Sequence, residues 1–182
     1  MRLERNYGEA IRLLQARQAQ FHFGVEYEKA EEQVHLALMH HLAGDTSGAT
    51  VTGEQARETL VRLYGDQPDD GFNAELLSQA YAAMGEKDSA LKQAERAKFV
   101  LDPGPKDAIS GPRSEENLAL IQTIVGNNSS AISTLTPLLQ TPYNSWLYIP
   151  APITSAFLRL DPFWDPLRGD PAFQKLCEDK QK

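Results

Sequence analysis

The sequence has few of the residues that most compact chemical sites require. It contains a single cysteine, Cys177, so it can form no intrachain disulfide and offers no Cys-x-x-Cys pair for zinc or redox work. No uncharged apolar stretch approaches the ~20 residues that cross a bilayer, and the opening residues contain no apolar core of a secretory signal. We therefore expect a soluble, cytoplasmic chain without a membrane segment.

Basic residues are also scarce. The chain has 18 Lys and Arg against 25 Asp and Glu, which gives a formal net charge of -7. No run of basic residues forms the stripe or cluster that contacts a phosphate backbone. Nucleic acid is therefore not an expected partner.

Motifs of phosphate binding and of nucleophilic catalysis are missing: the sequence contains no GxxxxGK[ST], GxGxxG, GxSxG or HExxH. His35 lies five and six positions before His40 and His41, whereas metal-binding pairs on one helix face need i, i+3 or i, i+4 spacing. We interpret His40 as a packed large residue and the many carboxylates as a solvated surface. The expectation is a protein without enzymatic activity, metal or cofactor.

What the sequence does contain is a repeat of 41 residues. Three segments, "QVHLALMHHLAGD", "NAELLSQAYAAMGEKD" and "EENLALIQTIVGNN", share a leucine, a small residue and a closing glycine at equal spacing. These positions are Leu36, Leu77 and Leu118, then Ala37, Ser78 and Ala119, then Gly44, Gly85 and Gly126. The pattern predicts three helices, each ended by a glycine in the left-handed conformation.

A second amphipathic stretch follows each glycine, with Ala56, Ala90 or Ala131 near its start. We expect capping by a Thr52–Gln55 capping box in the first stretch, by Asp88 in the second, and by Asn128 or Ser129 in the third. Small residues at these places let paired helices approach closely. The unit is a helical hairpin, with "TSGATV" lengthening its first turn and "GPKDAISGPRS" its second linker.

The hairpins resemble the tetratricopeptide repeat, whose usual period is about 34 residues. The best match comprises Leu77, Ser78, Tyr81, Gly85, Ala90, Ala94, Ala97 and Pro103. The resemblance implies an all-α fold, an α-solenoid of three hairpins preceded by a half-repeat at about residues 6–20. The array would occupy residues 1–140, and residues 141–182 would form a C-terminal capping segment of the same domain.

The stretch "LRLDPFWDPLRGDPAFQKL" carries too many large apolar groups for a solvated tail. We expect Trp164, Leu167 and Phe173 to cover the last hairpin, with Asp161 and Asp170 capping short helices that open on proline. The stretch is similar to the closing segment of tetratricopeptide regions in bacterial signalling proteins, where such regions follow kinase, cyclase or winged-helix domains.

In tetratricopeptide arrays the first helix of each hairpin lines a concave groove. The resemblance places nine residues there: Val34, Leu38, His41, Glu75, Gln79, Ala82, Glu116, Leu120 and Thr123. It implies a non-enzymatic scaffold that binds a protein or peptide, as the interaction or sensor region of a bacterial signalling protein. Glu75 and Glu116 favour a partner with a basic segment. Lys and Asn, which hold peptide carboxylates in some arrays, are missing from these positions.

Three alternatives stay open. One is a small-ligand receptor or enzyme with a site between the groove and the aromatic region of Trp146, Tyr148 and Trp164. Another is a homodimer through the N-terminal helix, whose Tyr7 and Leu14 exceed what one neighbouring hairpin would cover. The last is a solvated groove that holds no ligand.

Overall fold

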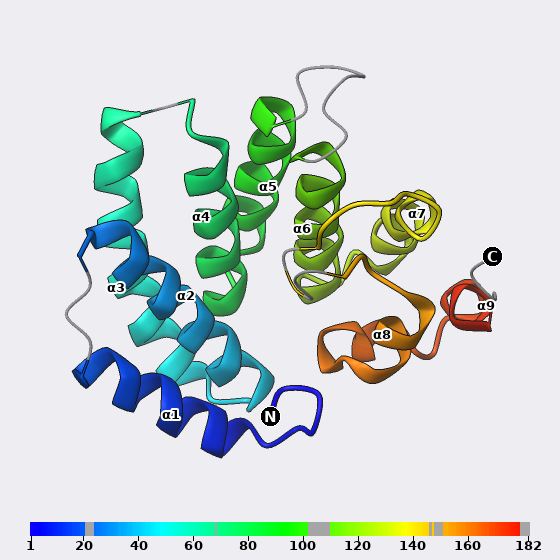
Figure 1. Cartoon of the computed structure of the whole chain (residues 1–182), viewed down its shortest axis with the longest axis horizontal. Coiled ribbons are helices and arrows are strands. Elements are labelled where there is room, and N and C mark those ends of the chain that lie inside the picture. The colour runs from blue at the N-terminus through cyan, green and yellow to red at the C-terminus, as the bar shows by residue number, and fades with distance from the viewer. Residues whose placement is uncertain (21–23, 68, 102–109, 146, 148–150, 179–182) are drawn as a thin grey trace.

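The computed structural model describes residues 1–20, 24–67, 69–101, 110–145, 147 and 151–178. Within these residues all regular structure is helical, as expected (Figure 1). The elements are α1 (Tyr7–Gln20), α2 (Glu26–Leu42), α3 (Thr46–Asp66), α4 (Gly71–Met84), α5 (Lys87–Leu101), α6 (Ser110–Ile124), α7 (Asn128–Leu138), α8 (Ser155–Leu160), the 3₁₀ helix η1 (Pro162–Leu167) and α9 (Pro171–Glu178).

The helices pack in adjacent pairs, α2 with α3, α4 with α5 and α6 with α7 (Figure 1). Helix α4 contacts both α2 and α6, so these three form one layer, while α3 and α5 lie behind it. Helix α1 packs against α2. We call the side of α2, α4 and α6 that is turned away from α3 and α5 the inner face.

The predicted glycine stops are confirmed. Gly44, Gly85 and Gly126 have φ values of 73°, 83° and 89°, in the left-handed region that favours glycine. At the end of α4 the Gly85 amide donates to the carbonyl of Ala82 and the Glu86 amide to that of Tyr81. These bonds satisfy carbonyl groups that the end of a helix would otherwise leave without a partner.

The cap predicted for the helix after Gly44 is wrong. Helix α3 begins at Thr46, and the Asp45 carboxylate caps it by accepting from the Gly48 amide at 2.9 Å. Thr52 lies inside the helix and donates to the Gly48 carbonyl. An aspartate directly after the glycine provides an earlier start than the capping box. The segment "TSGATV" is therefore helical, and the long period reflects a longer helix rather than a longer turn.

Two other predicted caps also shift by a residue or two. Asp88 lies in the first turn of α5, which begins at Lys87. Asn127 is the residue before α7 and makes no side-chain capping bond. Asn128 instead donates from Nδ2 to the Pro166 carbonyl of η1 at 3.2 Å, and so connects the last hairpin to the C-terminal segment.

The C-terminal segment packs its large side chains inward. Asp161 accepts from the Phe163 amide at 3.1 Å and Asp170 from the Ala172 amide at 2.8 Å, as expected for the Asp-Pro openings. Helix α8 begins at Ser155 behind a Thr154 cap, a little later than Pro152 suggested. Element η1 contacts α6 and α7, and α9 contacts α7 and α8. The large side chains buried here are Ile153, Leu158, Phe163, Trp164, Leu167 and Phe173.

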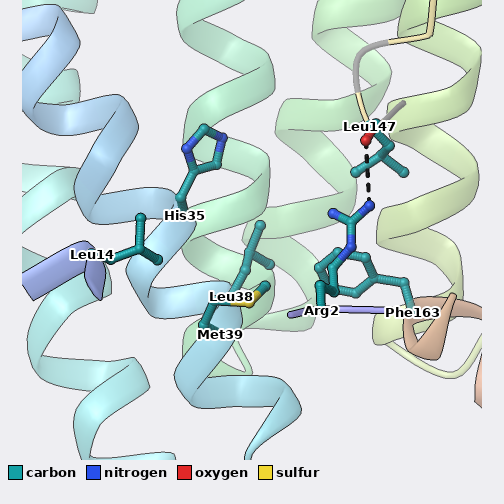
Figure 2. A pocket seen from close by; sticks show the side chains of 7 residues that line it. All are labelled: Arg2, Leu14, His35, Leu38, Met39, Leu147 and Phe163. Atoms are coloured by element: carbon teal, nitrogen blue, oxygen red, sulfur yellow. Dashed lines mark hydrogen bonds between the residues drawn. The ribbon is translucent and has the colours of Figure 1, made fainter. Parts of the chain in front are cut away.

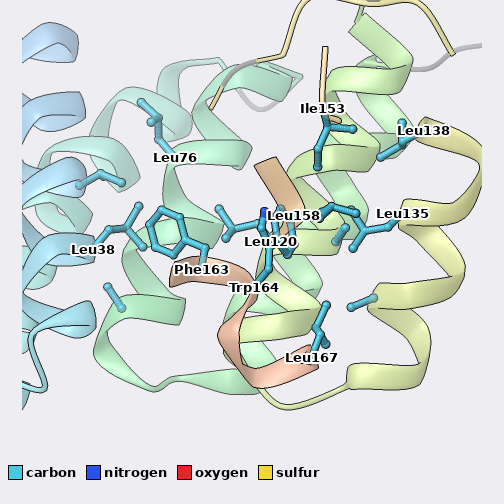
Figure 3. Close-up of a cluster of buried hydrophobic side chains, with 14 of the residues drawn as sticks. Leu38, Leu76, Leu120, Leu135, Leu138, Ile153, Leu158, Phe163, Trp164 and Leu167 are labelled. Atoms are coloured by element: carbon cyan, nitrogen blue, oxygen red, sulfur yellow. The ribbon is translucent and has the colours of Figure 1, made fainter. Parts of the chain in front are cut away.

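These side chains belong to the main hydrophobic core rather than to a separate cap. Figure 3 shows Trp164 beside Leu120 of α6 and Phe163 directed toward Leu38 of α2. The C-terminal segment therefore covers the inner face as well as the end of the array. Among the described helices, none combines the length and the apolar character needed to cross a bilayer.

Candidate functional site

The nine residues predicted to line the groove lie on α2, α4 and α6, and all except His41 are buried. Val34 and Leu38 pack in the main core, as does Leu120. Ala82 faces a second cluster between α4, α5 and α6. Thr123 donates to the Ala119 carbonyl of its own helix at 2.8 Å. In this structure these predicted groove side chains contact other residues of the same chain.

Gln79 takes part in a buried polar network that joins α4 to α6. Its Nε2 donates to Asn117 Oδ1 at 2.8 Å, and Asn117 Nδ2 donates to Ser78 Oγ at 3.0 Å. Ser78 in turn donates to the Glu75 carbonyl at 2.6 Å. Asn117 is not among the residues predicted from the sequence, although a polar residue beside the repeat leucine Leu118 is a signal for such a helix-to-helix bond.

Glu116 binds the C-terminal segment. Its Oε1 accepts from Ser145 Oγ at 2.7 Å and from the Leu147 amide at 3.4 Å. Ser145 is buried. A side-chain carboxylate of the inner face thus already binds Ser145 and Leu147 of the same chain.

Glu75 is a second buried acid of the inner face, with only 3% of its surface exposed. Arg113 Nε of α6 lies 3.9 Å from its Oε2. Burial raises the pKa of Glu75 to about 7; Arg113 lowers it and the Glu116 charge raises it further. Both acids predicted to attract a basic partner therefore have intramolecular partners, and burial in addition favours the neutral form of Glu75.

A cavity of about 310 Å³ lies between α1, α2, the first residues and the C-terminal segment (Figure 2). Its walls are mainly apolar, and two of its residues carry nitrogen-bearing polar groups. The lining residues are Arg2, Leu14, His35, Leu38, Met39, Leu147 and Phe163. We call this cavity the α1–α2 pocket.

Arg2 forms one wall of the α1–α2 pocket and fixes the C-terminal segment to it. Its Nη2 lies 2.8 Å from Asp161 Oδ2 and donates to the Leu147 carbonyl at 3.3 Å. Its guanidinium stands over the Phe163 ring, 5.0 Å from the centroid. Arg5 forms a parallel pair with Asp165. Sequence patterns gave no sign of these contacts because their partners are about 160 residues apart.

His35 contributes a neutral imidazole to the α2 side of the pocket. Burial lowers its pKa to about 4, and the positive charges of Arg2 and Arg17 lower it further. The imidazole is therefore neutral at neutral pH. Because Arg2 faces Asp161, the pocket as a whole suits an apolar occupant better than an ion.

The other sequence expectations fall in different places. Trp146 and Tyr148 lie outside the described residues. Leu14, the basis of the expected homodimer, lines the α1–α2 pocket, while Leu13 is more exposed. His40 is buried and its Nδ1 lies 2.7 Å from Asp45 Oδ2, where it supports the start of α3. No group of three or more metal-ligating side chains was found in the part of the chain that the structure describes.

Comparison with known proteins found no matching family model, no matching curated protein and no matching solved structure.

Proposed function

We propose that this chain is a non-enzymatic protein-binding scaffold of the tetratricopeptide type, and that its partner inserts a large apolar side chain into the α1–α2 pocket. The observation that carries the proposal is the pocket itself, an apolar cavity of about 310 Å³ beside the inner face. Interfaces concentrate their binding energy where an aromatic or aliphatic anchor fills a desolvated pocket. The repeat pattern and the similarity of the C-terminal segment to bacterial signalling proteins support the same role.

The free energy needed to displace buried side chains favours the α1–α2 pocket over the inner face as the place where a partner makes contact. A partner that lay along α4 and α6 would have to displace Phe163, Trp164, Leu167 and the rest of the buried C-terminal side chains. Each such side chain contributes about 1.5–3 kcal/mol when fully buried, so displacement would cost on the order of 10 kcal/mol. That is comparable to the whole stability of an ordinary domain. A partner can reach the pocket without this cost.

A small apolar ligand in the same pocket is the second candidate function. The volume of about 310 Å³ lies at the lower end of ligand pockets, ~300–1,000 Å³. Neutral His35 and the paired Arg2 would orient an uncharged molecule through a single polar group. This candidate corresponds to the receptor alternative, but moves its site from Trp146 and Tyr148 to the side of α2.

The proposal is tested by a pocket-filling variant and a control from the same helix. Leu14→Trp would fill the α1–α2 pocket, whereas Leu13→Trp adds the same side chain at a more exposed position of α1. Affinity capture from native extract, with cross-linking to locate the contact, should yield a protein that wild type and Leu13→Trp retain and Leu14→Trp loses. Equal capture by all three would exclude the pocket. Native mass spectrometry of the same samples would reveal a small ligand instead.

A further inference from the structure

A second cavity, of about 320 Å³, lies between α8, η1 and α9, away from the α1–α2 pocket. It combines two arginines with an apolar floor. The lining residues are Arg159, Arg168, Phe173, Gln174, Cys177 and Glu178. We infer that this cavity binds a small carboxylate with an apolar body, whose carboxylate group is held by Arg159 and Arg168.

The positive charge of Arg159 has no salt-bridge partner among the described residues. Its Nη1 donates to the Cys177 main-chain carbonyl near the end of α9, which is a dipole and not a full negative charge. A guanidinium has five N–H donors, so this bond leaves others directed elsewhere. Arg159 is exposed, and an anion can approach it.

Arg168 also lines the cavity and shares its counter-ion with Arg5. Its Nε pairs with Asp165, and Arg5 pairs with the same carboxylate. Its position is also held by the Gln174 side chain, which donates to the Arg168 carbonyl at 3.0 Å. Two guanidinium groups therefore meet one carboxylate here, and Arg159 and Glu178 add one charge of each sign, so these groups carry one positive charge in excess. This local excess stands out in a chain with a net charge of -7.

The floor decides which anion fits. Phe173 and Cys177 are both buried and present an aromatic ring and a thiol to the cavity. An inorganic oxyanion would leave that apolar surface in contact with water, whereas an alkyl or aryl group would cover it. Glu178 also lines the cavity, and its negative charge disfavours a second negative charge on the ligand. A monocarboxylate with a short apolar chain satisfies all three features.

The test uses the full chain and four probes in calorimetric titrations: hexanoate, hexanamide, hexylammonium and inorganic phosphate. Hexanoate should bind, and the neutral amide, the cation and phosphate should bind at least about tenfold more weakly, because a charge-assisted bond and the apolar contact are both needed. Arg159→Gln should weaken hexanoate about tenfold, with Arg159→Lys in between. Arg12→Gln, which removes an exposed arginine of α1, and Leu14→Trp, which fills the other pocket, should leave it unchanged.

The single cysteine supplies an independent readout, because Cys177 lines the cavity. Hexanoate should slow modification of the thiol by a small methanethiosulfonate reagent in wild type and not in Arg159→Gln. Loss of hexanoate binding in Leu14→Trp but not in Arg159→Gln would assign the carboxylate to the α1–α2 pocket and overturn the inference. Equal binding of hexanoate and hexanamide, or no binding of either, would also overturn it.

Discussion

Glu75 carries its carboxyl group at a buried position of α4, where the charges of Arg113 and Glu116 act on it and where it acts in turn on Tyr27 of α2. The fold holds its proton more tightly than the unfolded chain, with a pKa of about 7 against 4.5. Its contribution to the free energy of unfolding is therefore fully present below pH 4.5 and is lost as the pH rises through 7.

Glu75→Gln should remove the loss of stability that wild type suffers as the pH rises through 7. At about 1.4 kcal/mol per pKa unit, the variant should gain stability relative to wild type on the order of 3 kcal/mol between acidic and mildly alkaline pH. Urea unfolding at a series of pH values measures the difference. Glu58→Gln, at an exposed position of α3, is the control and should follow wild type. A Glu75→Gln curve parallel to wild type would contradict the burial argument.

His35 should titrate in the opposite sense. Its pKa is lowered from 6.5 to about 4, so its favourable contribution is present above pH 6.5 and is lost as the pH falls toward 4. Imidazole proton shifts followed by NMR should show a midpoint near pH 4. A midpoint near 6.5 would mean that the α1–α2 pocket admits water and charge more freely than the packing indicates.

At the scale of single elements, the start of α3 depends on Gly48. A Cβ at this position would collide with the His40 ring and the Asp45 carboxylate that cap the helix. Gly48→Ala should therefore destabilise the protein even though alanine is the better helix former. Gly65→Ala, in the same helix with open space around it, should stabilise it by about 0.5–1 kcal/mol. Thermal unfolding of the two variants compares them directly, and a gain from both would contradict this account of the cap.

A separate prediction concerns how much the C-terminal elements contribute to the free energy of unfolding. Trp164→Ala should cost about 3–5 kcal/mol, because the ring is fully buried in the main core. Leu160→Ala, in the same segment with the leucine 57% exposed, should change the free energy by less than about 0.5 kcal/mol. Chemical denaturation measures both. A Trp164→Ala protein as stable as Leu160→Ala would show that the segment is not part of the core.

The sequence predicts these elements well where the signal is local. The glycines at 44, 85 and 126 and the Asp-Pro openings each specify their own conformation within a few residues. The start of α3 was missed because Asp45 and Thr52 both fit a cap, and the choice depends on how His40 packs. The buried state of Glu75 and Glu116 was missed because it depends on Arg113 and Ser145, which no short-range pattern connects to them.

At the scale of the whole molecule, the two ends of the described chain close the structure together. Arg2 and Arg5 pair with Asp161 and Asp165, so the first residues and the C-terminal segment form one wall of the α1–α2 pocket. Exposed large apolar side chains are scattered over the described chain, Met1 and Leu3 beside Arg2 among them, and Phe99 of α5 is the most exposed at 82%. Contacts of this sequence separation form only after the helices have packed, and helical periodicity does not encode them.

We propose that the C-terminal segment fills the inner face and leaves the α1–α2 pocket for a partner. Hydroxyl-radical footprinting of the full chain, read residue by residue by mass spectrometry, tests it most directly. Leu120 and Trp164 should be labelled as slowly as other core residues, while Phe99 and Leu160 should be labelled rapidly. Rapid labelling of Leu120 and Trp164 in the unbound protein would show that the inner face is open and would contradict the account.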